Sequence, residues 1–234
     1  MNSIGTLQEN SLHAALKAWY VQPGDQLESM VDGYVIDLVR GNLLVEIQSA
    51  NFSAIKRKLV KLLESHRVRL VYPIPSEKWI LRISGDGATV LGRRKSPKRG
   101  ELNDIFQELV RIPMLVPHPS FTLEVLLIRE EVVWREDGRG SWRRKGRSIA
   151  DRRLLEVLAG YVFTSPDDFR VFIPEDLPQI FTVRDLAKQS GQPRFLARKM
   201  AYCLREMGVI ELVGKHGRSL AYQVMPVDNK STAV

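Results

Sequence analysis

The chain has a single cysteine, Cys203, among its 234 residues. That scarcity excludes an internal disulfide framework and a zinc site built from several thiolates. No uninterrupted apolar run reaches membrane-spanning length, and the first residues lack the basic-then-apolar pattern of a secretion signal. The 44% hydrophobic content suits a folded globular core. We therefore expect a cytoplasmic protein without a membrane partner.

Acidic residues are outnumbered, because 35 Lys and Arg stand against 27 Asp and Glu, giving a net charge of +8 and a pI near 9.7. Such a surplus favours a polyanionic partner when it gathers near a site. Two basic stretches are the densest, at residues 93–100 and 143–147. The charge pattern favours DNA as the partner, and RNA stays open because nothing in the sequence separates the two.

Two apolar stretches, residues 31–39 and 43–48, flank a Gly-Asn dipeptide at 41–42 that is typical of a two-residue hairpin turn. In such a hairpin Asp37 lies opposite Glu46 on the same face, with the two Cβ atoms about 5 Å apart. Like charges at that separation destabilise a hairpin unless a cation lies between them. The pattern indicates a divalent-metal site, and the alternative is that one acid lies on a solvated strand edge.

Periodicity around the hairpin predicts the order helix, hairpin, helix, strand. The expected elements are a helix at about 8–21, the hairpin, a helix that includes 52–63, and a strand at 68–72 that joins the sheet in parallel. Further on, we expect a strand at 79–83, an exposed loop at 93–100, a short helix at 103–110 and strands within 121–133 whose solvent side carries Glu124, Arg129, Glu130 and Glu131.

This order, with an Asp, a short gap and a Glu-x-Gln element, resembles the PD-(D/E)XK nuclease superfamily over roughly the first third to half of the chain. The resemblance implies an α/β (α+β) class, with a restriction-endonuclease-like core of a mixed sheet flanked by helices. It also implies a metal-dependent deoxyribonuclease that uses Mg²⁺ or Mn²⁺, with Asp37, Glu46 and Gln48 as site residues. Two positions depart from the family pattern: Ile36 replaces the proline, and Gln48 replaces the lysine.

Three further residues are candidates for that site. Lys56 can supply the missing positive charge, or it belongs to a solvated basic helix face. Glu9 and Glu28 are acids of the kind that relatives of the superfamily bring to the metal, although Glu9 equally suits an exposed helix face. The lost lysine supports a second interpretation, a non-catalytic DNA-binding regulator with a degenerate nuclease-like core. Cleavage of both strands would favour a homodimer.

The composition predicts two domains. We expect a nuclease-like domain at 1–135, a basic linker at 136–150, a smaller domain at 151–226 that begins with a helix near 154–161, and a tail at 227–234. Within the smaller domain, Thr182 and Asp185 match a capping box at the start of a helix. A second helix follows Pro193, with an inward stripe of Phe195, Leu196, Met200, Cys203 and Leu204.

These two helices and a hairpin at 209–224 resemble a winged helix-turn-helix, in which the second helix enters the major groove and the wing contacts the adjacent backbone. The resemblance implies DNA contacts by basic residues of that helix and wing, and the basic loop of the first domain can add phosphate contacts. The candidates are Arg194, Arg198, Lys199, Lys215 and Arg218 in the smaller domain, and Arg93, Arg94, Lys95 and Lys98 in the loop.

Overall fold

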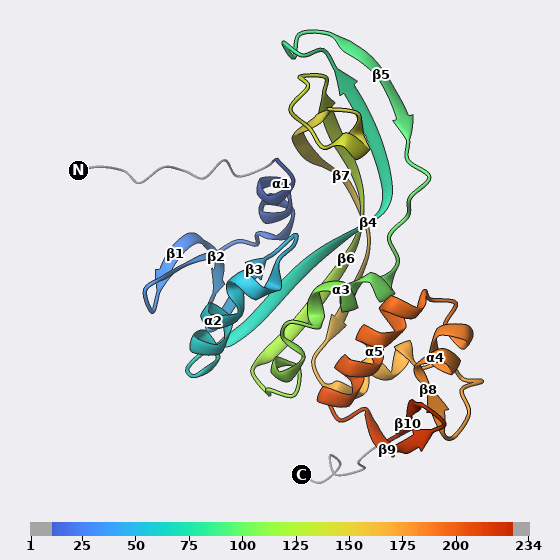
Figure 1. Ribbon diagram of the computed structural model, residues 1–234. Coiled ribbons are helices and arrows are strands. Elements are labelled where there is room, and N and C mark those ends of the chain that lie inside the picture. Colours follow the sequence, from blue (N-terminus) through green and yellow to red (C-terminus); the bar gives the residue numbers. More distant parts are fainter. Residues whose placement is uncertain (1–10, 227–234) are drawn as a thin grey trace. The chain divides into compact units, whose positions relative to one another are not determined.

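The structure, a computed structural model, describes residues 11–226 and has a mixed α+β architecture with a large sheet flanked by helices (Figure 1). These residues form two compact units, each assembled from three segments of the chain. Within the described range, unit 1 comprises residues 11–49, 70–102 and 124–161, and unit 2 comprises residues 50–69, 103–123 and 162–226.

Unit 1 holds most of a seven-stranded sheet with the order β1-β2-β3-β4-β6-β7, in which β5 pairs with β4. Three long strands of this sheet, β4, β6 and β7, also contribute end residues to unit 2. The elements are α1 (Ser11–Tyr20), β1 (Gln26–Val31), β2 (Tyr34–Arg40), β3 (Leu43–Ile47), β4 (Arg67–Ile83), β5 (Val90–Lys95), β6 (Phe121–Arg135), the short 3-10 helix η3 (Trp142–Arg144) and β7 (Ser148–Phe163).

Helix α1 covers the sheet of unit 1 through one apolar stripe. Leu12, Leu16 and Tyr20 recur every fourth residue, which places them on one face of the helix. They pack in one cluster with six buried sheet residues, Leu38, Val45, Ile47, Val71, Leu126 and Ile128. Burying each large apolar side chain contributes about 1.5–3 kcal/mol, so this stripe fixes α1 against the strands that carry the acidic hairpin.

The hairpin of β2 and β3 has the predicted register. Leu38 pairs with Val45 and Arg40 with Leu43, which leaves Gly41 and Asn42 as the two-residue turn. Gly41 has a φ of +56°, a left-handed value that hairpin turns of this length require and that glycine adopts without strain.

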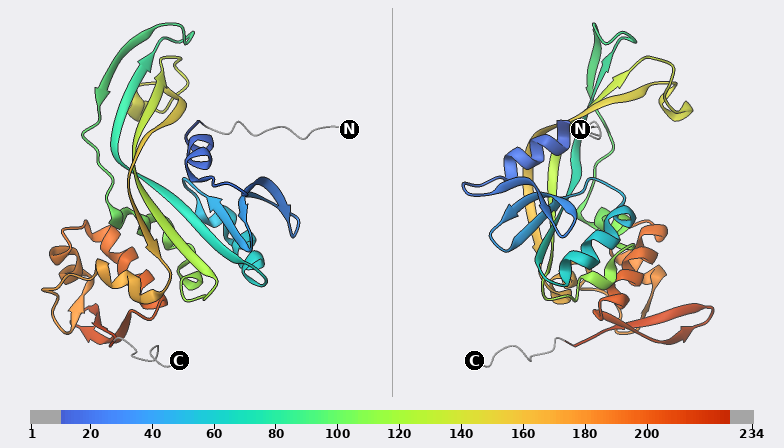
Figure 2. Two further views of the ribbon diagram at one scale, coloured as in Figure 1. Left: turned by 180° about the vertical axis from the view of Figure 1, so that it is seen from behind. Right: turned by 90° about the vertical axis from the view of Figure 1, so that its left-hand side faces the viewer.

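Unit 2 has a core of aromatic residues and a small three-stranded sheet with the order β8-β10-β9. The rings of Phe106 and Phe172 lie 4.8 Å apart, and those of Phe163 and Phe169 lie 4.6 Å apart. Figure 2 shows the β9–β10 hairpin beside α4 and α5. The elements are α2 (Phe52–Leu63), η1 (Leu102–Ile105), α3 (Phe106–Leu109), η2 (Pro113–Leu115), η4 (Pro166–Phe172), β8 (Phe181–Thr182), α4 (Val183–Gln189), α5 (Arg194–Glu206), β9 (Ile210–His216) and β10 (Ser219–Val224).

Three predictions about elements are wrong. The strands expected at 68–72 and 79–83 are one continuous strand, β4, which the prolines at 73 and 75 do not interrupt. The expected helix at 154–161 is part of strand β7, because its adjacent apolar pairs also suit a strand with apolar residues on both faces. Leu154 packs against the core of unit 1, whereas its neighbour Leu155 is exposed. The first three residues of the expected loop at 93–100 are also in a strand, since Arg93, Arg94 and Lys95 belong to β5 and pair with β4, whereas residues 96–100 lie outside any helix or strand.

Candidate nucleic-acid interface

Local sequence signals fix the start of α4. Thr182 is the N-cap, and its hydroxyl accepts a hydrogen bond from the Arg184 backbone N–H at 3.2 Å. The Asp185 carboxylate in turn accepts from the backbone N–H and the hydroxyl of Thr182, at 2.9 and 2.8 Å. These two hydrogen bonds from Thr182 lower the pKa of Asp185. The predicted capping box is therefore confirmed.

Helix α5 buries most of the predicted stripe. Leu196, Met200, Cys203 and Leu204 are almost fully buried, but Phe195 is 57% exposed, so its predicted inward position is wrong. Phe195 precedes the buried Leu196 by one residue, a rotation of roughly 100° around the helix axis that carries it off the core-facing stripe. Burial raises the pKa of the Cys203 thiol to about 12, which keeps it protonated and excludes it as a nucleophile at neutral pH.

The outer face of α5 borders a depression of about 350 Å³, here called the arginine depression. Its walls come from the first turn of α4, the exposed face of α5 and strand β10. The lining residues are Val183, Arg184, Arg194, Arg198, Tyr202, Arg205, Ser219, Leu220 and Tyr222. Four of these nine residues are arginines and none is acidic, so the depression is strongly electropositive.

Three of the four arginines keep their charge available for a ligand. Within residues 11–226, Arg184, Arg194 and Arg198 form no ion pair, and all three are exposed. Arg205 differs, because it bonds the Glu206 carboxylate at 2.5 Å. A guanidinium is a planar fork of donors that matches a phosphate, so this depression has the chemistry to bind a phosphodiester backbone.

The other predicted contacts of unit 2 divide between this face and other roles. Arg194 and Arg198 line the arginine depression, whereas Lys199 donates to the Gln107 carbonyl oxygen at 3.2 Å and so ties α5 to α3. Lys215 and Arg218 are exposed on β9 and its turn into β10, outside the lining. The prediction missed Arg184 and Arg205, although the spacing of residues 194, 198 and 205 already indicated one face of a helix.

The acidic hairpin of unit 1 forms a second polar cluster. Asp37 Oδ2 accepts a hydrogen bond from the Ile47 backbone N–H at 2.8 Å and lies 3.3 Å from His13 Nε2. His13 Nε2 also lies 2.9 Å from the Ile47 carbonyl oxygen. Because both atoms that face Nε2 are acceptors, that nitrogen carries a proton. Burial raises the pKa of Asp37, but the hydrogen bonds from His13 and Ile47 outweigh it and lower the pKa.

Only some of the other residues predicted for this site lie close to Asp37. Extending the hairpin register by one pair places the buried Glu46 opposite Asp37, as predicted, and the Gln48 backbone N–H donates to Val71 at 2.9 Å. Glu28 on β1 instead pairs with Lys17 at 2.5 Å. Lys56 lies on α2, which belongs to unit 2. Glu9 lies outside the described residues.

The described residues do not make a complete metal site. Between residues 11 and 226 no three His, Cys, Asp or Glu side chains form a group that could hold a metal ion. Asp37 and Glu46 are hard-oxygen ligands of the kind Mg²⁺ prefers. However, two carboxylates alone supply fewer ligands than a divalent ion needs, and Asp37 Oδ2 already faces His13 Nε2.

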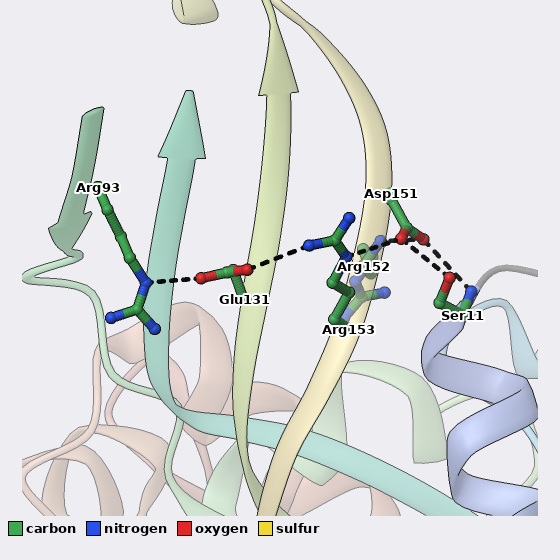
Figure 3. A network of polar contacts seen from close by, with 6 residues as sticks. All are labelled: Ser11, Arg93, Glu131, Asp151, Arg152 and Arg153. Carbon is green, nitrogen blue, oxygen red and sulfur yellow. Dashed lines mark hydrogen bonds and ion pairs between the residues drawn. The ribbon is translucent and has the colours of Figure 1, made fainter. Parts of the chain in front are cut away.

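The predicted phosphate contacts on β5 are partly neutralised. Arg93 pairs with Glu131 at 2.7 Å and stacks 4.2 Å above the Trp79 ring, and Lys95 pairs with Glu77 at 3.1 Å. Arg94 and Lys98 are exposed and have no acidic partner among residues 11–226. The Arg93 pair belongs to a polar network in which Glu131 lies between Arg93 and Arg153, and Asp151 contacts Ser11 (Figure 3).

Comparison with known proteins places the chain in a family. A family model described as a domain of unknown function (DUF8091) matches residues 10–164. The chain is also 33% identical over 231 residues to an uncharacterized protein of Treponema pallidum (strain Nichols), covering 98% of this chain and 91% of that protein. The chain belongs to the DUF8091 family. No solved structure matches it. Within residues 11–226, every helix is too short or too polar to cross a membrane.

Proposed function

We propose that the protein binds double-stranded DNA, with unit 2 acting as a winged helix-turn-helix and α5 as its recognition helix. The observation that carries the proposal is the arginine depression, where three exposed arginines form no ion pair among residues 11–226. The order of α4, α5 and the β9–β10 hairpin supports it, because modules of that order place the second helix in the major groove.

The dimensions and chemistry of α5 fit this role. Its 13 residues span about 20 Å, long enough to lie in a major groove with both flanking phosphate rows in reach. Arg194 and Arg198 lie one turn apart on its exposed face, so the two guanidinium groups can contact the same stretch of DNA. Arg184, at the start of α4, extends the positive surface towards a neighbouring phosphate.

Removing one of these arginines should weaken DNA binding. We expect Arg198→Ala to reduce affinity for a random-sequence duplex by about tenfold, and to lower the slope of log K against log salt by about one. Fluorescence anisotropy with a labelled duplex at several salt concentrations measures both. Lys188→Ala is the matched control, since it removes an equal charge from an exposed position of α4 outside the depression. Equal losses in both variants would contradict the proposal.

A second candidate function is metal-dependent cleavage of the bound DNA. It is favoured by the hairpin register, which brings the buried Glu46 opposite Asp37 on neighbouring strands as the nuclease resemblance requires. For this function, a cation would have to bind the Asp37 carboxylate, whose Oδ2 lies 3.3 Å from His13 Nε2. Otherwise unit 1 is a nuclease-like scaffold without catalysis, and DNA binding is the whole activity.

The response of the protein to manganese distinguishes DNA cleavage from DNA binding without cleavage. If unit 1 is a nuclease, Mn²⁺ should raise the melting temperature of the wild type, and Asp37→Asn should abolish that rise. Glu46→Ala should abolish Mn²⁺-dependent nicking of plasmid DNA and leave duplex binding unchanged. Glu64→Ala is the control, because this exposed acid pairs with Lys61 one turn away. A wild type that neither gains stability nor nicks DNA in Mg²⁺ or Mn²⁺ would reject cleavage.

A further inference from the structure

The connection between β6 and β7 carries the most exposed large hydrophobic side chain among residues 11–226. Trp142, in the short helix η3, is 81% exposed, more than any other large hydrophobic residue between residues 11 and 226. An indole ring that stays exposed to water does not contribute the stabilisation that a tryptophan gives when its large apolar surface is buried. A tryptophan at such a position is therefore suited to stack against a flat partner.

Backbone hydrogen bonds and one close backbone contact hold the connection between β6 and β7 in a defined turn. The Gly140 N–H donates to the Gly146 carbonyl at 2.7 Å, and the Lys145 N–H donates to the Trp142 carbonyl at 2.9 Å. A Cβ at position 140 would lie 1.7 Å from the Arg147 carbonyl oxygen, so only glycine permits this close approach. These contacts define a tip, residues 138–146, that presents Trp142 on a pre-formed turn.

The tip is also positively charged. The side chains of its three exposed cations, Arg139, Arg143 and Lys145, form no ion pair among residues 11–226. Two acids lie at its base: Glu136 Oε1 binds Arg82 at 2.6 Å and Arg147 at 2.8 Å, and Asp137 accepts hydrogen bonds from the Ser148 hydroxyl at 2.7 Å and the Arg139 backbone N–H at 3.0 Å. Arg82 and Arg147 also lower the pKa of Glu136, which keeps it ionised and paired.

We propose that the tip is a separate binding site for single-stranded nucleic acid. Trp142 stacks on an unpaired base, while the surrounding cations contact the phosphates on either side. Single-strand sites combine a basic surface with aromatic side chains on which successive bases stack. The guanidinium carbon of Arg143 lies over the Trp142 ring, 5.6 Å from its centroid, and adds a cation to that platform.

Two other partners fit the tip less well. A duplex stacks its bases on one another, so it offers no free base face to an indole except at its ends or at a distorted step. A lipid surface requires a broad apolar face, yet Trp142 is flanked by Ser141 and Arg143 and has no apolar neighbour within the tip. An unpaired strand supplies both the base face and the negative charge that this tip can use.

Binding of a labelled oligo-dT of 20 nucleotides tests the proposal. We expect Trp142→Ala to weaken this binding by about tenfold and Trp142→Phe to retain most of it, because phenylalanine keeps a stacking face. Trp19→Ala is the matched control, as Trp19 is also exposed but lies on α1. Trp142 buries little surface, so its loss should leave the melting temperature unchanged.

The outcomes separate this site from the arginine depression. If both proposals hold, Trp142→Ala weakens oligo-dT binding and spares duplex binding, whereas Arg198→Ala does the reverse. Equal affinity of Trp142→Ala and the wild type for oligo-dT would overturn the single-strand site, whatever the duplex result. A wild type that binds phosphatidylglycerol vesicles through Trp142 and ignores oligo-dT would overturn it as well, in favour of a membrane contact.

Discussion

Glu130 is a fully buried carboxylate that two cations hold in place. Its side chain is 0% exposed, and it binds Lys78 at 2.8 Å and Arg152 at 2.7 Å. Removing an ion from water carries a desolvation cost of several kcal/mol, which the close contacts with two cations offset. The arrangement is stable only as a set, because loss of the carboxylate leaves two cations without their partner.

Glu130→Ala should therefore reduce the free energy of unfolding by about 3–5 kcal/mol, the usual result of breaking a buried ion pair. Urea unfolding at neutral pH measures this change. Glu156→Ala is the control, because Glu156 pairs with Arg129 but is 52% exposed, and exposed pairs contribute about 0–1 kcal/mol. Similar losses for the two variants would show that the Glu130 cations find other partners or water.

The acidic residues of β6 show where sequence reasoning fails at the level of single side chains. Glu124, Glu130 and Glu131 suggested a solvated strand face, yet all three are buried. Their partners come from other elements: Tyr20 donates to Glu124 at 2.6 Å, and Arg93 binds Glu131. Partners separated by so many residues leave no local pattern, so their pairing emerges only from the sheet.

At the scale of elements, α4 is stabilised by a cap whose strength depends on pH. Asp185 accepts two hydrogen bonds from Thr182, and these lower its pKa in the folded protein. In the unfolded chain an aspartate titrates near a pKa of about 3.9. Since the folded pKa is the lower one, the carboxylate stabilises the fold above about pH 4, and this contribution is lost as the pH falls through the folded pKa.

Asp185→Asn should accordingly lower stability at pH 7 and flatten its decline below about pH 4. The expected loss at pH 7 is about 1 kcal/mol, typical of a helix cap. Urea unfolding at pH 7, 4.5 and 3 follows both effects. Asp176→Asn serves as the control, because Asp176 is an exposed acid of the same unit. If the two variants lose stability in parallel, the capping box is not the source of the pH dependence.

Elements defined by local signals could be predicted, and those defined by distant pairing could not. The capping box, the Gly-Asn turn and the first helix are each encoded within a few residues, and each is present. Strand β7 is different, because its adjacent leucines fit a helix or a strand equally well. Hydrogen bonding to a neighbouring strand of the large sheet decides in favour of the strand. That neighbouring strand cannot be recognised from the local sequence of β7.

At the scale of the whole molecule, the positive surplus is unevenly used. Many cations of unit 1 form ion pairs with acidic residues of its sheet, as Arg93, Lys78 and Arg152 illustrate. Among the cations that form no ion pair within residues 11–226, one group lines the arginine depression and another lies at the β6–β7 tip. The net charge of +8 alone could not show this division, because it counts paired and available charges alike.

The two units are threaded through one another along the chain, with three segments each. Phe106 lies within the family match that ends at residue 164, whereas its ring partner Phe172 lies beyond it. Replacing all residues after 164 by an unrelated sequence in evolution would thus remove the aromatic neighbour of Phe106 and leave an apolar surface uncovered. We therefore expect the parts of the chain before and after residue 164 to be inherited together and not to be recombined as independent modules.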